Sequence, residues 1–106
     1  MTKLVVHLLG GFRVELDGEA VYEFATDKAR ALLAYLVVEA SRPHRRETLA
    51  GLLWPDRPDT VARTNLRQAL ARLRRALSDY TNPPFLFVTS TDVQFNTASD
   101  YALDVA

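Results

Sequence analysis

Hydrophobic and polar positions near the start of the chain alternate as they do in a small β-sheet. Residues 3–9 form a short apolar run, Gly10-Gly11 interrupts it, and residues 12–16 then alternate between apolar and polar side chains. A period of two residues is typical of a half-buried strand. Asp17-Gly18 predicts a tight turn, after which residues 20–24 can return as a third strand. We therefore expect a small antiparallel sheet at the N-terminus.

The apolar spacing then changes to the three- and four-residue steps of amphipathic helices. A first helix is predicted over residues 28–42, with Thr26 or Asp27 as its N-cap. A short extended stretch follows. Residues 47–54 predict a second helix of about two turns, which Pro55 ends.

The third predicted helix, residues 59–77, is the longest and contains neither glycine nor proline. Asp59 is a suitable N-cap. Its apolar side chains fall within an arc of roughly 120° that faces a core: Ala62, Leu66, Ala69, Leu70, Leu73, Ala76 and Leu77. The remaining surface is polar and rich in arginine, with five arginines between Arg63 and Arg75.

Two β-rich stretches, residues 85–89 and 93–97, follow the helices and predict a hairpin with its turn at residues 90–92. Residues 98–106 have weak helical character, and we expect them to be a linker or the start of a following helical domain. The order of sheet, three helices and hairpin predicts an α+β fold, a winged helix, over residues 1–97. The hairpin would be its wing.

Composition excludes several classes of protein. The 106 residues, 48% hydrophobic and 25% charged, fit one folded domain. Cysteine is absent, which excludes a disulfide framework and cysteine-ligated metal sites and favours the cytoplasm. No apolar run approaches the roughly 18 residues of a membrane span, and the N-terminus lacks the layout of a signal peptide.

Residues that could carry catalysis are sparse. His7 lies in an apolar strand and His44 near a helix start, and isolated histidines without partners at suitable spacing are more often structural. None of the common nucleotide-binding, hydrolase or zinc-protease motifs occurs. We expect a protein that is not an enzyme, with no metal, cofactor or small-molecule ligand in this domain.

Charge is distributed unevenly although 13 basic and 13 acidic residues give a net charge of zero. Residues 1–40 carry four basic and six acidic residues, residues 41–75 carry nine and three, and residues 76–106 carry none and four. All nine cations of the middle third are arginines, whose planar fork pairs with phosphates and guanine edges. A merely solvated helix face would more often mix glutamate with lysine, so an anionic partner is indicated.

Four segments together resemble a known family. They are Leu-Leu-Gly-Gly-Phe-Arg-Val at residues 8–14 and the longer stretches 28–36, 46–54 and 65–77. They resemble the OmpR/PhoB-type winged helix, and more narrowly the version that opens SARP-type regulators, where a bacterial transcriptional activator domain follows. The resemblance covers residues 3–97, and residues 100–106 are similar to the family's entry into the activator domain.

The resemblance implies that the helix at residues 59–77 is a recognition helix in the DNA major groove. The base-facing positions are then Thr64, Arg67, Gln68, Ala71 and Arg72. The implied phosphate contacts are Arg45, Arg46, Arg63, Arg74 and Arg75. The wing of the family usually carries a basic residue, whereas residues 85–97 contain Asp92 and no lysine or arginine. From this wing we expect weak contacts, made by the hydroxyls of Thr89, Ser90 and Thr91.

The function expected from these observations is sequence-specific binding of double-stranded DNA by a bacterial transcription regulator. The resemblance suggests an activator that binds in tandem to direct repeats. The alternative is a winged helix that docks other proteins, such as RNA polymerase or a regulatory domain of the same chain. A docking surface would expose apolar residues on the third helix, whereas this helix presents threonine, glutamine and arginine.

Overall fold

The computed structural model describes residues 3–22, 26–78 and 84–104 of the chain. Part of the predicted third strand, residues 23 and 24, lies outside the described residues. The elements follow in the order β1 (Leu4–His7), β2 (Arg13–Leu16), β3 (Glu19–Ala20), α1 (Asp27–Val38), β4 (His44–Arg45), α2 (Arg46–Leu53), α3 (Asp59–Ala76), β5 (Leu86–Val88), β6 (Asp92–Phe95) and β7 (Tyr101–Asp104).

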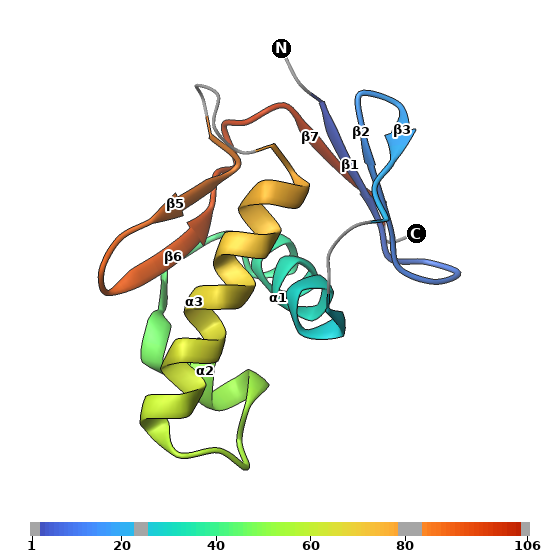
Figure 1. The fold of residues 1–106 in the computed structure, drawn as a ribbon. Coiled ribbons are helices and arrows are strands. Elements are labelled where there is room, and N and C mark those ends of the chain that lie inside the picture. Colours follow the sequence, from blue (N-terminus) through green and yellow to red (C-terminus); the bar gives the residue numbers. More distant parts are fainter. Residues whose placement is uncertain (1–2, 23–25, 79–83, 105–106) are drawn as a thin grey trace.

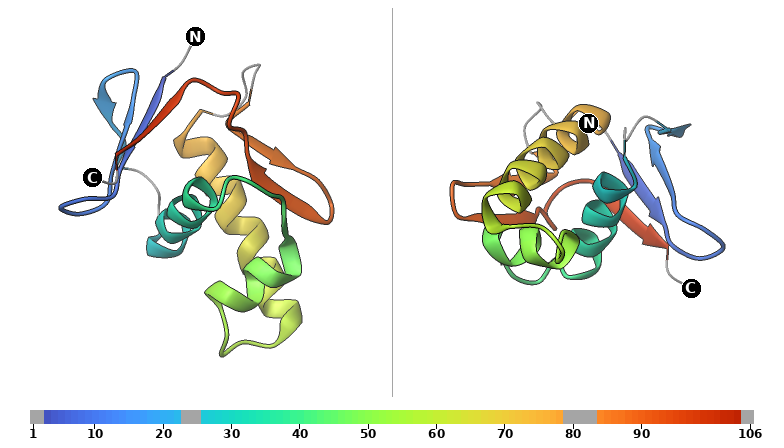
Figure 2. Two further views of the ribbon diagram at one scale, coloured as in Figure 1. Left: turned by 180° about the vertical axis from the view of Figure 1, so that it is seen from behind. Right: turned by 60° about the horizontal axis from the view of Figure 1, so that its bottom comes forward.

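Of the three helices, α1 and α3 lie between two small sheets, and α2 packs at the lower end of α3 in Figure 1; Figure 2 gives two further views. One sheet has the strand order β3-β2-β1-β7 and the other the order β4-β6-β5. The second sheet contains the predicted hairpin, whose strands β5 and β6 are antiparallel and pair Leu86 with Phe95. This is an α+β winged helix, so the predicted fold class is confirmed.

The helices begin within one residue of their predicted starts, whereas α1 ends at Val38, four residues before its predicted limit. Thr26 is the N-cap of α1, and its hydroxyl oxygen accepts a hydrogen bond from the Ala29 N–H at 3.2 Å. The cap predicted for α3 is wrong by one residue, because the extended backbone of Pro58 forms the N-cap and Asp59 is the first helical residue. Asp59 still places a negative charge in the first turn, where the helix dipole favours it.

The core forms where the inner faces of the helices and both sheets meet. Five predicted apolar positions of α3 are buried, Leu77 beyond its end is buried too, and Ala76 is half-buried. Trp54 is half-buried and packs against this core. The α3 helix packs on both α1 and α2, which holds its inner face against the core.

The end of the chain differs from its prediction. Residues 101–104 are not helical but form strand β7, which pairs in parallel with β1 so that Leu4 lies opposite Tyr101. Tyr101 packs edge-on against Phe95, with ring centroids 4.7 Å apart. The contacts of Tyr101 and Leu103 with the core hold β7 in the first sheet, despite its weak local preference for a strand. Among the described residues, no helix is long and apolar enough to cross a membrane.

Candidate nucleic-acid interface

The polar face of α3 is exposed along its length. With Ala62, Leu66, Ala69 and Leu70 turned into the core, the helical period of 3.6 residues leaves the opposite side facing outward. The exposed side chains are those of Arg63, Thr64, Arg67, Gln68, Ala71, Arg72 and Arg75. All five predicted base-facing residues and two predicted phosphate contacts therefore share one surface.

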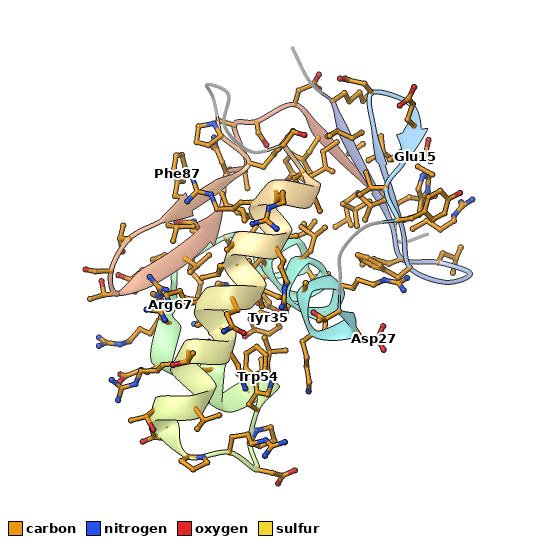
Figure 3. The ribbon with its side chains drawn as sticks, viewed as in Figure 1. Glu15, Asp27, Tyr35, Trp54, Arg67 and Phe87 are labelled. Atoms are coloured by element: carbon orange, nitrogen blue, oxygen red, sulfur yellow. The ribbon has the colours of Figure 1, made fainter. Side chains whose placement is uncertain are left out.

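A hollow of about 230 Å³ lies where α2, α3 and the wing meet. Its lining includes the three arginines Arg46, Arg63 and Arg67, together with Thr64, Leu66 and Ser90. In Figure 3, Arg67 lies on the side of α3 that is turned toward the hairpin. The hollow brings together members of all three predicted groups: base-facing, phosphate-contacting and wing residues.

Arg46, the first residue of α2, is bonded to the wing twice. Its backbone N–H donates to the carbonyl oxygen of Thr91 at 2.8 Å. Its guanidinium Nη1 donates to the carbonyl oxygen of Thr89 at 3.0 Å. The start of α2 and the tip of the hairpin are therefore one connected unit.

The wing turn is ordered by its own hydrogen bonds. The Thr89 hydroxyl oxygen accepts from the backbone N–H of Asp92 at 2.9 Å, and the Thr91 hydroxyl donates to the Asp92 carboxylate at 2.9 Å. The Thr89 hydroxyl also donates to the Asp92 carbonyl oxygen at 3.3 Å. The donors of both threonines are thus used inside the turn, whereas Ser90 faces the hollow.

The arginines of this surface are largely without carboxylate partners. Arg45 pairs with Glu47, with 3.2 Å between Nε and Oε1, but both side chains are well exposed, so the pair is weak. In the part of the chain that the structure describes, no ion pair involves Arg46, Arg63, Arg67, Arg72 or Arg75. Unpaired guanidinium groups on one face attract an anion with an extended array of charges.

Two predicted residues are less available than their positions in the sequence suggest. Arg74 is half-buried and its Nε is shielded from solvent. The Thr64 hydroxyl donates to the Thr60 carbonyl oxygen one turn earlier, at 3.0 Å, which leaves its lone pairs and methyl group for outside contacts. Gln68, Ala71 and Arg72 lie on the exposed face beyond the hollow.

The bond between Arg46 and the Thr89 carbonyl could not be found from the sequence. The two residues are 43 positions apart, and a carbonyl oxygen carries no sequence signature. The sequence hints at this bond only through two separate facts: the wing has no basic residue, and two arginines stand together at residues 45–46.

The two histidines have structural contacts. Nε2 of His7 lies 2.7 Å from a Glu15 carboxylate oxygen, and Nδ1 lies 3.1 Å from one of Asp104. His44 is buried, and its Nε2 lies 2.7 Å from the Glu39 carbonyl oxygen. Within the described ranges, no group of three or more potential metal ligands is arranged to hold an ion.

Comparison with known proteins places this geometry in a family. The family described as "Transcriptional regulatory protein, C terminal" matches residues 24–93. The "Transcriptional regulatory protein EmbR" of Mycobacterium bovis and that of Mycobacterium tuberculosis are each 36% identical to the chain over 70 residues. This match covers 66% of the chain and 18% of each relative.

A solved structure, "Mycobacterium tuberculosis EmbR in complex with low affinity phosphopeptide", has the same fold. It superposes with a TM-score of 0.74 at 28% sequence identity, over 91% of this chain and 26% of that one. The resemblance to the OmpR/PhoB-type winged helix of SARP-type regulators is therefore confirmed. Because the family match spans most of the chain, this protein belongs to the transcriptional regulatory protein, C-terminal domain family.

Proposed function

We propose that this chain is the sequence-specific, double-stranded-DNA-binding part of a bacterial transcription regulator. The α3 helix would enter the major groove, which is wide enough for one α-helix. The role is binding and not catalysis, it needs no cofactor, and its place is the cytoplasm, where bacterial DNA lies.

The observation that carries this proposal is the exposed face of α3, where arginines without an ion pair to any described residue stand among Thr64, Gln68 and Ala71. Arg67 and Arg72 have the forked geometry that pairs with guanine, and Gln68 has the amide that pairs with adenine. Arg63 and Arg75 are exposed on the same helix and suit the flanking phosphates. The arginines and the glutamine of this face can therefore recognise bases, and the arginines also attract the phosphates of the DNA backbone.

The relatives support regulation of transcription, but the chain spans only about a fifth of their length. We therefore extend to this chain only the regulatory class that their names give. Activation, binding to direct repeats and contact with RNA polymerase are further proposals that depend on the whole regulator.

Protein docking is the second candidate. Six large apolar side chains are exposed among the described residues: Leu9, Tyr22, Val38, Leu52, Val61 and Phe87. Val61, near the start of α3, belongs to the helix that we assign to DNA, and the other five lie elsewhere. The polar face of α3 therefore favours DNA, and docking would use a different surface.

Fluorescence anisotropy on a random duplex pool at several salt concentrations tests the proposal. We would compare the 106-residue chain, the double variant Arg67→Met/Arg75→Met, and Arg13→Met as a matched control on the first sheet. Loss of the phosphate contact of Arg75 should lower the slope of log affinity against log salt by about one. Loss of the base contact of Arg67 should weaken binding to a selected site by about 1–3 kcal/mol.

The control should bind as the parent chain does, because Arg13 is exposed on β2, in the other sheet from the wing. Selection from the pool should then yield a site bound at least about a thousandfold more tightly than random duplex. A folded sample that binds no DNA at low salt, or binding that the double variant leaves unchanged, would favour the docking alternative.

A further inference from the structure

The wing contains no cation of its own, yet a cation stands at its tip. Asp92 of β6 pairs across the sheet with Arg45 of β4, and the next residue, Arg46, is bonded to the turn through both its backbone and its guanidinium group. The positive charge beside this wing is therefore supplied by the β4–α2 junction.

The guanidinium group of Arg46 contacts both the wing and the hollow. Arginine offers five N–H donors in a fixed plane. The Nη1 of Arg46 donates to the Thr89 carbonyl oxygen at 3.0 Å, while the same side chain lines the hollow shared with α3. The hydrogen bond restricts the rotation of the long side chain, so the remaining donors are held beside the hollow.

The side chains that line the hollow give it a positive charge. Arg46, Arg63 and Arg67 line it and no acidic residue does. None of the three forms an ion pair within the described part of the chain. Three cations around one small hollow repel one another, and an anion bound among them removes that repulsion. The neighbouring Ser90 adds a hydroxyl donor at the rim.

We infer that this hollow binds a backbone phosphodiester of the DNA and that the wing acts on DNA through Arg46, whose guanidinium the Thr89 carbonyl holds in place. This inference rests on the proposed function. Arg46 and Arg63 contact the phosphate, Arg67 adds its positive charge to the hollow while it faces the bases, and Thr89 is a positioning residue. The wing then needs no basic residue of its own.

The test is a double-mutant cycle on the 106-residue chain, read by anisotropy with a selected duplex. Arg46→Met should lower the salt slope by about one. Thr89→Val removes the hydroxyl that organises the turn and should weaken binding of the parent chain by about five-fold. In the Arg46→Met background the same Thr89→Val change should have no effect, because its action passes through Arg46.

Arg46→Lys answers the same question by another route, and it decides the test if Thr89→Val fails to fold. Lysine keeps the positive charge, but its single ammonium group cannot bond the Thr89 carbonyl oxygen and also present a planar pair of donors to a phosphate. Binding should therefore weaken while the salt slope is retained. Arg46→Lys binding as tightly as the parent chain would overturn the positioning role.

A second measurement locates the phosphate. Single phosphates of the duplex would be replaced in turn by neutral methylphosphonates. At one phosphate of each site the replacement should weaken DNA binding by the parent chain and leave DNA binding by Arg46→Met unchanged. Arg13→Met is the control and should respond to each replacement as the parent chain does.

Three results separate the possibilities. A Thr89→Val effect of equal size in both backgrounds would mean that the wing contacts DNA directly, and the inference would be wrong. DNA binding with an Arg46→Met salt slope equal to that of the parent would exclude the phosphate site while leaving the proposed function intact. Absence of DNA binding by the folded parent chain would remove the proposed function itself.

Discussion

The imidazole Nδ1 of His7 lies 3.1 Å from the carboxylate of Asp104, although 97 residues separate them in sequence. The other ring nitrogen, Nε2, lies 2.7 Å from Glu15. One side chain of β1 thus joins the strands on either side of it, β2 and β7. The contact combines with backbone pairing to hold the C-terminal strand in place.

Replacing His7 with leucine should loosen this connection, because Glu15 and Asp104 would lose the partner between them. The groups are partly exposed, so solvent screening limits the loss of unfolding free energy to about 1 kcal/mol. Urea denaturation measures it. Asp104→Asn should cost less in the His7→Leu background than alone; equal costs would show that the two residues are not coupled.

Leu70→Ala should destabilise the domain by about 2–5 kcal/mol, because it leaves a cavity in the core. Leu70 is 3% exposed and belongs to the buried face of α3. Gln68→Ala, on the exposed face of the same helix, is the control and should stay within about 0.5 kcal/mol. Equal urea midpoints for the two variants would contradict the burial of this face.

Arg72→Ala should weaken binding to a selected site more than to random duplex, by about 1–3 kcal/mol of specificity. Its side chain is exposed beyond the hollow and free of ion pairs with described residues. The melting temperature should not change. Parallel titrations of selected and random duplex decide the matter, since an equal loss on both would assign Arg72 to a phosphate.

Lys28→Met should weaken the contact between α1 and α2. The Lys28 ammonium donates to the Leu53 carbonyl oxygen at 2.6 Å and lies 5.9 Å from the centre of the Trp54 ring. Losing both contacts should cost about 1 kcal/mol. Trp54 is the one tryptophan, so its emission should shift in the folded variant. Lys3→Met is the control, and an unshifted spectrum would mean that the ammonium does not influence the ring.

The sequence predicts best what depends on neighbouring residues. Asp17 and Gly18 have φ angles of 53° and 84°, as a two-residue hairpin turn requires, and the pair was recognisable in the sequence. The helix faces followed from periodicity in the same way. The exposed side of α3 also contains every base-facing residue that the family resemblance implied.

Contacts between distant segments were not predictable. Tyr-Ala-Leu-Asp at residues 101–104 has no strong preference for a strand, and its pairing depends on β1 and on packing against Phe95. Arg74 looks as exposed as Arg75 in sequence, yet only the packed structure shows that its Nε is enclosed. The bond from Arg46 to the Thr89 carbonyl belongs to the same class.

The parallel pairing of β1 with β7 also has a consequence for how the domain forms. Nearly the whole chain must close as a loop before these strands can meet, and contacts of such high sequence separation form slowly. During synthesis, β1 is made first and keeps an open edge until residue 104 has left the ribosome. An open strand edge can pair with other chains. The arrival of the last strand covers the edge of β1, and β7 then becomes the edge strand of the sheet in its place.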